Sequence, residues 1–366
     1  MLIVHLDDEN LSVQTNHERL IMAPDYHPLV VDRVIPETPD ASTLALQIPA
    51  SLQPLFQFEP GQFLTLRIPR EDRFSPRCYS ISSGSPTCIS VTVKRVRGGF
   101  GSNWLLDHLK PGDTIGVRPP SGRFTLRPSV APLVFFAAGS GITPMMSMLH
   151  HAAATGSTRL MAMFYANQSA EQAIFGETLR ALSEGSTPAF QLCEWLDDVS
   201  GYATAEDIRG FATRWSTAQF MVCGPEPFMH LVIHTLEEMG VQPDQIQTEK
   251  FQSLADEPLE PSIAMRGAAD QTAGFAAQLE VSVSGETHTV PVHAGETLLA
   301  AMEREGLAIP YSCREGSCGS CMGKLLEGTV EMDVTDALSP RELERGYVLT
   351  CQARPTAAVL RLDIDA

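Results

Sequence analysis

Four cysteines near the C-terminal end most constrain what this chain can fold into. Cys313, Cys318 and Cys321 are separated by four and two residues, and Cys351 follows after 29 more. This is the plant-type spacing in which four thiolates hold a [2Fe–2S] cluster. Small residues such as Gly316 fill the loop, so backbone N–H groups can point at the cluster sulfurs. The pattern predicts a metal centre that carries single electrons.

A structural zinc site is the alternative use of these cysteines. Such sites usually pair two Cys-x2-Cys knuckles, and this stretch contains one. Disulfides fit less well, because two bridges in so tight a loop would have no structural purpose. The remaining cysteines lie far apart in the sequence, at Cys78, Cys88, Cys193 and Cys223. We therefore expect reduced thiolates, an iron–sulfur cluster and a cytoplasmic setting.

The totals limit the size and partners of the protein. A chain of 366 residues is long enough for two or three domains, each with its own core. The net charge of −18 argues against a nucleic-acid partner. The N-terminus lacks the basic and apolar regions of a signal peptide, and the longest apolar run, Leu133–Ala138, is too short to cross a membrane. We expect no membrane association, and nothing in the sequence demands more than a monomer.

Changes in composition and in hydrophobic pattern divide the chain into five segments. Residues 1–27 are polar and acidic, which indicates a loosely ordered extension. Residues 28–128 contain short alternating strands between Pro/Gly turns, which predict a small antiparallel β-barrel. Residues 129–255 alternate strand and helix patterns, which predict an α/β domain with a parallel sheet. Residues 256–276, rich in Ala, Pro, Gly and acid, predict a linker, and residues 277–366 predict a compact α+β domain around the cysteines.

The barrel segment carries two motifs suited to a phosphate-bearing aromatic ligand. Arg77 can hold a phosphate bidentately, Tyr79 offers a ring face and Ser80 offers a hydroxyl. The glycine-rich run 98–103 leads into a helical pattern over 104–109, where N–H groups and the helix dipole favour an anion. Either motif alone could be an ordinary turn. Together, in a segment with 12 Lys and Arg against 8 Asp and Glu, they point to a dinucleotide.

Two loops of the α/β segment predict a second nucleotide site. Gly139 and Gly141 lie between an apolar strand and a helix, where a parallel sheet binds phosphates. A Gly-x-Gly alone is weak evidence, but the run 223–225 after another buried strand supplies a second loop at the same edge. His150 and His151 follow on the first helix. Adjacent helical side chains point in different directions, so we expect both to be surface residues.

Together these motifs resemble the ferredoxin–NADP reductase superfamily, in the subgroup with a C-terminal plant-type ferredoxin domain. The likeness covers residues 28–366 and keeps the motifs in the family's order. It implies a FAD-binding antiparallel β-barrel, an α/β NAD(P)-binding domain and an α+β ferredoxin domain of β-grasp type. Within the superfamily, the chain is most similar to the reductase components of 3-ketosteroid 9α-hydroxylases, and next to those of phenylacetyl-CoA epoxidases.

The resemblance also implies roles for individual residues. The FAD contacts would be Arg77 on the pyrophosphate, Tyr79 on the flavin, Ser80 near flavin N5, Ser83, Gly99 and Ser102. The pyridine-nucleotide contacts would be Gly139, Gly141, Thr143 near the nicotinamide, Pro144, Cys223, Gly224 and Pro225. Glu249 and Phe251 would belong to a segment that closes over the other face of the flavin. The reaction centre would comprise Ser80, Thr143 and Cys223, and the cluster ligands would be Cys313, Cys318, Cys321 and Cys351.

These roles imply an electron relay from a pyridine nucleotide through FAD to the cluster, and on to a separate terminal oxygenase. Relatives often carry Asn-Arg after Tyr-Ala, where this chain has Asn167 and Gln168. An arginine there could hold a 2′-phosphate, so its absence favours NADH over NADPH. Two other functions stay open. One is a flavin reductase or diaphorase that serves small acceptors, and the other is a redox sensor whose cluster reports rather than conducts.

Overall fold

In the computed structural model, the described chain forms two compact units. Within the described residues, unit 1 covers the ranges 26–120 and 126–248, and unit 2 covers the range 275–366 with the short segments 121–125 and 249–251. The structure describes residues 26–70, 73–185, 190–251, 275–307, 309–311, 314, 316, 318–335, 337–338 and 340–366.

Parts of three predictions lie outside the described residues. These are nearly all of the N-terminal extension 1–27, nearly all of the linker 256–276, and the ligand Cys313. The predicted barrel and parallel sheet, and most of the predicted cysteine domain, lie within the described residues.

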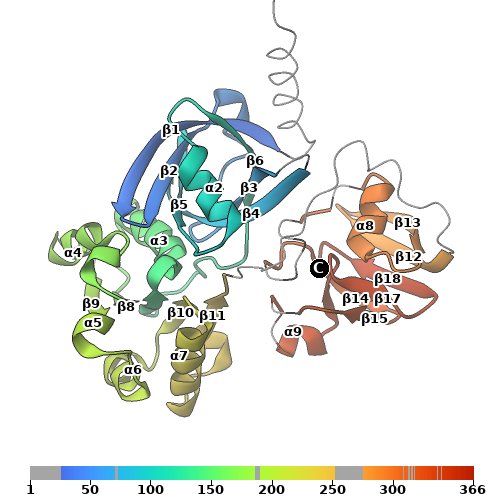
Figure 1. Cartoon of the computed structure of the whole chain (residues 1–366). Coiled ribbons are helices and arrows are strands. Elements are labelled where there is room, and N and C mark those ends of the chain that lie inside the picture. The colour runs from blue at the N-terminus through green and yellow to red at the C-terminus, as the bar shows by residue number, and fades with distance from the viewer. Residues whose placement is uncertain are drawn as a thin grey trace, which may run out of the picture. The chain divides into compact units, whose positions relative to one another are not determined.

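A closed six-stranded antiparallel barrel forms the first part of unit 1, as the alternating pattern predicts (Figure 1). Side chains such as Leu44, Leu46, Ile89 and Val91 alternate along their strands and are fully buried in its core. The strands are β1 (His27–Thr38), β2 (Ala41–Gln47), β3 (Phe63–Arg70), β4 (Arg73–Ser85), β5 (Cys88–Lys94) and β6 (Thr114–Ser121), in the order β1-β2-β5-β4-β3-β6, with the short turn η1 (Ala50–Leu52) after β2.

The helix after β5 begins earlier than the sequence indicated. Helix α2 spans Phe100–His108, with Gly99 as its N-cap, whereas the apolar pattern predicts a start at residue 104. Ser102 and Asn103 therefore lie in the first turn of the helix and not in the loop before it. The side-chain amide of Asn103 donates to the carbonyl of Val96 at 2.9 Å, which ties this first turn to the preceding loop. Tertiary contacts of this kind leave no hydrophobic period in the sequence.

A five-stranded parallel sheet follows, in the order β11-β10-β7-β8-β9. Every residue of β7 is buried, which explains its unbroken run of apolar residues. From β7 the polypeptide first adds β8 and β9 on one side, and then returns to add β10 and β11 on the other side. The boundary between β7 and β10 is therefore the topological switch point of the sheet. The strands are β7 (Leu133–Ala138), β8 (Met161–Asn167), β9 (Phe190–Leu196), β10 (Gln219–Cys223) and β11 (Ile246–Glu249).

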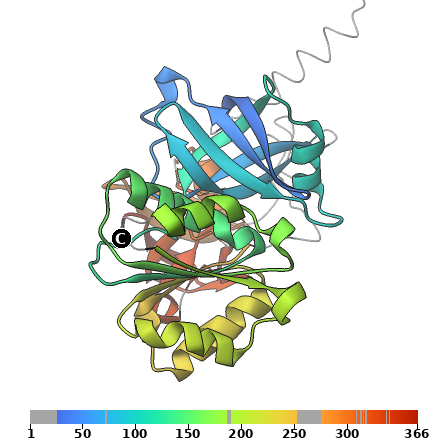
Figure 2. The same cartoon turned by 90° about the vertical axis from the view of Figure 1, so that its left-hand side faces the viewer.

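Helices cover both faces of this sheet (Figure 2). Buried Ile208 of α6 and Val232 of α7 pack on one face, with core residues of the strands. Helix α3 covers the other face and also packs against β4 of the barrel. Met145 and Met148 of α3 are fully buried, in agreement with a packing role. The elements are α3 (Ile142–Ala154), α4 (Gly176–Gly185), α5 (Asp197–Ser200), α6 (Ala205–Ala212) and α7 (Glu226–Glu238), with the short turns η2 (Gly139–Gly141), η3 (Ala170–Gln172), η4 (Thr213–Trp215) and η5 (Pro243–Gln245).

Unit 2 contains a mixed five-stranded sheet and a two-stranded ribbon, joined by two short helices. Strand β12 pairs with β13 as an antiparallel hairpin and with β18 in parallel. The α+β architecture that the sequence predicts is therefore present. The strands are β12 (Phe275–Val283), β13 (Glu286–His293), β14 (Met322–Glu327), β15 (Val330–Met332), β16 (Tyr347–Leu349), β17 (Ala353–Pro355) and β18 (Val359–Asp363), and the helices are α8 (Leu298–Arg304) and α9 (Pro340–Glu344).

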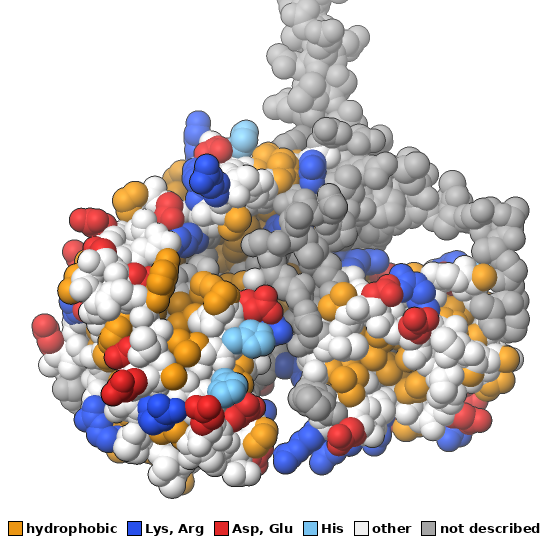
Figure 3. All heavy atoms as spheres, turned by 60° about the horizontal axis from the view of Figure 1, so that its bottom comes forward, with side chains coloured by type: hydrophobic (Ala, Val, Ile, Leu, Met, Phe, Trp, Pro, Cys, Tyr) orange, Lys and Arg blue, Asp and Glu red, His pale blue; other side chains and the backbone are white. Residues whose placement is uncertain are grey.

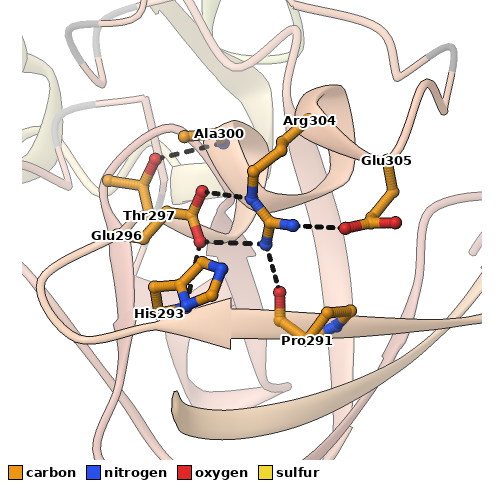
Figure 4. Close-up of polar contacts among 7 residues, drawn as sticks. All are labelled: Pro291, His293, Glu296, Thr297, Ala300, Arg304 and Glu305. Carbon is orange, nitrogen blue, oxygen red and sulfur yellow. Dashed lines mark hydrogen bonds and ion pairs between the residues drawn. The ribbon is translucent and has the colours of Figure 1, made fainter. Parts of the chain in front are cut away.

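Polar contacts at both ends fix helix α8 on this sheet (Figure 4). The Thr297 hydroxyl caps its N-terminus by accepting from the N–H of Ala300 at 3.3 Å. At the other end Arg304 donates to Glu296 at 3.1 Å and also contacts the Pro291 carbonyl. Gly306 follows with φ +79°, the left-handed conformation that its predicted place after the helix requires.

The surface is mixed in character. Figure 3 shows acidic, basic and apolar side chains interspersed over the described part of one face of unit 1, without one continuous apolar area. Singly exposed apolar side chains, such as Val199 and Tyr202 around α5, are ordinary on soluble surfaces and mark no site by themselves. Among the described helices, none has the length and apolar content that a membrane span requires.

Candidate functional site

The barrel brings its two predicted phosphate-binding motifs together. Arg77, Tyr79 and Ser80 lie on β4, with Ser80 buried opposite Phe63 of β3. A Cβ atom added to Gly101 in the first turn of α2 would lie 2.8 Å from Cγ of Arg77. The arginine stem therefore crosses the N-terminal end of α2. A guanidinium beside a helix N-terminus suits a diphosphate, since both present donors to an anion.

Ser102 has a structural contact that the sequence did not reveal. Its hydroxyl accepts a hydrogen bond from the N–H of Val96 at 3.0 Å. The N–H of Gly99 donates to the carbonyl of the same Val96 at 3.0 Å, so the loop is closed from both ends. A hydroxyl that accepts in this way keeps its own proton to donate to a phosphate.

The two predicted nucleotide loops meet at the switch point of the parallel sheet. A Cβ on Gly141 would lie 2.2 Å from the carbonyl oxygen of Cys223 and 2.7 Å from the nitrogen of Gly224. A Cβ on Gly224 would in turn lie 3.0 Å from that of Ala138. Only glycines allow this backbone-to-backbone approach. The contact brings the ends of β7 and β10 together, where a dinucleotide binds in folds of this kind.

The neighbouring predicted residues lie on the first turns of two helices. Thr143 is buried in the first turn of α3, and its hydroxyl donates to the carbonyl of Ser140 at 3.0 Å. Pro144 is the next residue and is also buried. Pro225 is the N-cap of α7, directly after Gly224.

The remaining predicted flavin contacts fall at the margins of these elements. Ser83 is half-buried beside the register shift between β4 and β5. Glu249 ends β11, and Phe251 follows it with 42% of its surface exposed. Both Glu249 and Phe251 belong to the short segment that clusters with unit 2.

The sequence missed two side chains that contact the Gly139 loop. The Tyr165 hydroxyl donates to the carbonyls of Gly139 at 3.1 Å and Ile174 at 3.2 Å, and burial raises the pKa of this phenol far above its usual value. The Lys94 ammonium lies 3.8 Å from the position of a Cβ on Gly139, and 3.8 Å from a carboxylate oxygen of Asp40. Lys94 is the last residue of β5, and a single lysine at a strand end gives no local sign of such a long-range contact.

The prediction that His150 is a surface residue holds only in part, because this side chain is half-buried. The His150 ring lies against the barrel, where burial lowers its pKa and a hydrogen bond with the backbone of Ser82 opposes that shift. His151 is exposed, as expected. The cause is the packing of α3 against β4, which sequence periodicity within one helix cannot reveal.

Acidic groups lie beside the end of β8. The backbone N–H of Asp198 donates to the carbonyl of Gln168 at 3.0 Å, which holds α5 next to the turn after Asn167. Burial, and then the charge of Asp198, raise the pKa of the Asp197 carboxyl. This end of the sheet thus combines an uncharged Gln168 with two carboxylates.

Three described residues of the cysteine loop of unit 2 adopt the left-handed backbone conformation. Arg314, Gly316 and Gly319 have φ of +60°, +78° and +70°. A Cβ on Gly316 would lie 3.0 Å from side-chain atoms of Val334 and Gln352, so that position also needs a glycine. The described cysteines alone, without Cys313, form no three-ligand metal group.

Hydrogen bonds tie the distal cysteine to this loop. The N–H and hydroxyl of buried Thr350 both donate to the carbonyl of Cys321, at 3.1 and 2.9 Å. The side-chain amide of Gln352 donates to the carbonyl of Arg314 at 3.0 Å and lies 3.8 Å from Sγ of Cys351. The segment that carries Cys351 is therefore held against the segment that carries Cys321, as a shared cluster requires.

These features define a class of protein: a modular reductase that combines a flavin barrel, a pyridine-nucleotide sheet and an iron–sulfur domain. Family models agree, with an oxidoreductase FAD-binding domain over residues 28–126, an oxidoreductase NAD-binding domain over 135–234, and a 2Fe-2S iron-sulfur cluster binding domain over 281–356. The fold also matches phthalate dioxygenase reductase, with a TM-score of 0.58 and 23% identity over 95% of this chain and 99% of that one.

Two relatives extend over nearly the whole chain. One is the ferredoxin reductase component of 3-ketosteroid-9-alpha-monooxygenase from Rhodococcus rhodochrous, 39% identical over 92% of this chain and 96% of the relative. Another is a component of the 1,2-phenylacetyl-CoA epoxidase from Escherichia coli (strain K12), 31% identical over 93% of this chain and 98% of the relative.

The chain belongs to the ferredoxin–NADP reductase superfamily with a C-terminal plant-type ferredoxin domain, among the reductase components of multicomponent oxygenases. It is an oxidoreductase that uses FAD, a nicotinamide nucleotide and a [2Fe–2S] cluster.

Proposed function

We propose that this protein takes electrons from NADH and delivers them one at a time to a separate terminal oxygenase that acts on a steroid or a similar substrate. The observation that carries the proposal is the approach of Gly141 to Cys223, directly beside a helix that packs on β4. This approach forms the edge of the parallel sheet at which the nucleotide would bind, next to the strand β4 that bears Arg77, Tyr79 and Ser80. FAD, when bound there, supplies the chemistry that converts a hydride donor into a source of single electrons.

The protein's own part in this proposal is to bind and orient. Arg77 and the first turn of α2, from Gly99 to Ser102, hold the FAD diphosphate, while Tyr79, Ser80 and Ser83 border the flavin ring. Gly139, Gly141, Pro144, Gly224 and Pro225 line the nucleotide, and Thr143 and Cys223 flank its reactive ring. Glu249 and Phe251 close the far side of the flavin. Hydride transfer needs no general base, which agrees with a site built from hydroxyl, aromatic and glycine residues.

The end of β8 supports NADH over NADPH as the donor. Gln168 brings no positive charge there, and the contact between the Asp198 N–H and the Gln168 carbonyl places carboxylates alongside. A 2′-phosphate at this edge would meet negative charge without a compensating arginine, which costs affinity.

Cys313, Cys318, Cys321 and Cys351 are proposed to hold the cluster, and residues 28–128, 129–255 and 277–366 to form the three domains. Partner and setting are proposed from the Rhodococcus relative, whose name assigns it to a ketosteroid monooxygenase. A monomer in the cytoplasm is consistent with this role, since the oxygenase would collect electrons from the cluster domain.

An anaerobic titration of the purified holoprotein with NADH, and separately with NADPH, tests the proposal. Flavin bleaching is followed by absorbance and the cluster by electron paramagnetic resonance. We expect NADH to reduce both centres at the lower concentration. Bleaching of the flavin with an oxidised cluster would contradict the relay and favour a flavin reductase or a sensor.

A further inference from the structure

A chain of hydrogen-bonded hydroxyls crosses three strands of the barrel and ends at a carboxylate. The Thr43 hydroxyl of β2 lies 2.7 Å from Oε1 of Glu37 and 2.7 Å from the hydroxyl of Thr92. The Thr92 hydroxyl of β5 lies 2.9 Å from that of Ser82 on β4. The Ser82 hydroxyl lies 3.3 Å from the carbonyl oxygen of Ser90. We call Glu37, Thr43, Thr92 and Ser82 the hydroxyl chain.

The hydroxyl chain is buried although it lies on the outer face of the barrel. Thr43, Thr92 and Ser82 alternate with core residues, yet they are only 5%, 4% and 1% exposed. Helix α3 packs against β4, and the His150 ring of α3 bonds the backbone of Ser82. The chain therefore runs through the junction between the barrel and the nucleotide-binding sheet. Glu37 is half-buried at the end of β1, so the chain leads from that junction towards solvent.

The chain has more hydrogen-bond positions than protons. Its three hydroxyls supply three protons, but four contacts need one each: Glu37–Thr43, Thr43–Thr92, Thr92–Ser82 and Ser82–Ser90. With Glu37 ionised, the hydroxyls orient towards the carboxylate and the contact to the Ser90 carbonyl, the longest, lacks a proton. A proton on Glu37 reverses all three hydroxyls and fills every contact. One proton entering at Ser82 can thus be passed to Glu37 by a concerted shift.

We propose that the hydroxyl chain carries away the proton left behind when the protein converts a hydride into two single electrons. One NADH and two oxidised clusters give NAD⁺, two reduced clusters and one H⁺, so each turnover must release a proton from the buried site. Ser82 is two residues from Ser80 on β4, about 7 Å along the strand, and two hydrogen-bonded waters in sequence can bridge that gap. Glu37 is the acceptor at the outer end, and its carboxylate passes the proton to solvent.

Other titratable groups near the chain have different partners. Asp40 lies in the turn after β1 and faces Lys94 of β5 at 3.8 Å, and His150 faces the Ser82 backbone. Burial raises the pKa of the Glu37 carboxyl, and the hydrogen bond from Thr43 opposes that shift. Glu37 is therefore set to receive a proton more readily than an exposed glutamate would.

The proposal rests on the placement of the flavin by Arg77, Tyr79 and Ser80, and its test separates the two ideas. Holoprotein is reduced and then mixed rapidly with ferricyanide, a one-electron acceptor. Flavin reoxidation is followed by absorbance, and proton release by a pH-indicator dye in weak buffer. Glu37→Gln keeps the size of the side chain but accepts no proton, and Thr43→Val breaks the chain at its centre. Asp32→Asn, on the same strand but exposed and paired with Arg33, is the matched control.

We expect Glu37→Gln and Thr43→Val each to slow proton release and flavin reoxidation at least about tenfold, since a positioned proton acceptor typically contributes 10²–10⁴-fold. Asp32→Asn should match the wild type. Variants that lose thermal stability but release protons at the wild-type rate would overturn the proposal, because they show the chain to be structural. The reduction step can also be carried out with light instead of NADH, so the same comparison of variants can be made without any nucleotide. A failure of NADH to bleach the wild-type flavin would count against the proposed donor and leave this comparison intact.

Discussion

A Cβ atom on Gly141 would lie 2.2 Å from the carbonyl oxygen of Cys223, closer than any side chain permits. Gly141 directly precedes α3 and Cys223 is the last residue of β10, so the contact joins the loops after β7 and β10 at the switch point of the sheet. The overlap is with backbone, which cannot rotate away as a flexible side chain could. The two loops must therefore separate if this position carries anything larger than glycine.

We predict that Gly141→Ala destabilises the protein by about 1–3 kcal/mol and weakens NADH binding, because the separated loops no longer meet the nucleotide. Thermal unfolding and an NADH titration of the flavin measure the two effects. Gly210→Ala is a matched control: it lies in α6 with open space around it, and it should stabilise the protein by about 0.5–1 kcal/mol. Normal NADH binding by Gly141→Ala would contradict the proposed site.

Thr350 links two predicted cluster ligands, because its hydroxyl donates to the carbonyl of Cys321 while Cys351 follows it. Thr350→Val keeps the shape but leaves that buried contact unmade, at a cost of about 1 kcal/mol. We expect the visible absorbance of the cluster to decay faster in the presence of a chelator. Thr356→Val, which removes an exposed hydroxyl contact to Thr329, should decay at the wild-type rate. Equal decay of all three proteins would show that this link does not hold the cluster.

Nucleotide choice should respond to charge at the end of β8. Gln168→Arg combined with Asp198→Asn adds a positive charge and removes a negative one. A charge-assisted hydrogen bond is worth about 1.5–3 kcal/mol, so the kcat/KM for NADPH relative to NADH should rise roughly tenfold or more. Gln191→Arg, at the exposed position of β9, controls for added charge alone. An unchanged ratio in the double variant would place the adenosine ribose elsewhere.

Acid should weaken the junction between α3 and the barrel through His150. Burial holds the pKa of this imidazole below its usual value in the folded protein. As pH falls through the usual value of about 6.5, the unfolded chain takes up the proton first, so folding stability decreases. We expect His150→Gln to flatten the fall in the urea midpoint between about pH 7.5 and 5.5. His151→Gln, at the exposed neighbour, should retain the wild-type slope.

Local sequence patterns predicted most of the elements. The unbroken apolar run of β7 and the alternation in β5 both match observed strands. Strand β7 has apolar surroundings on both faces, whereas β5 packs its apolar side chains into the barrel core on one face and carries Ser90 and Thr92 on the other, so each environment imposes its own period on the sequence. The start of α2 was missed because its first turn is held by Ser102 and Asn103 contacts to Val96, which leave no period. The roles proposed for Arg77 and Gly141 came from motifs, and the structure adds what each of them touches.

The sequence by itself determined the cofactor classes and the order of the three domains, because cysteine spacing, glycine loops and strand periods are local properties of the chain. Only the tertiary structure decided which of these distant segments meet. It brought Gly141 to Cys223, carried His150 of α3 to Ser82 of β4, and aligned Glu37, Thr43, Thr92 and Ser82 into one hydrogen-bonded chain. Such contacts depend on how helices pack on sheets and how strands pair, and a single sequence records those long-range choices only weakly.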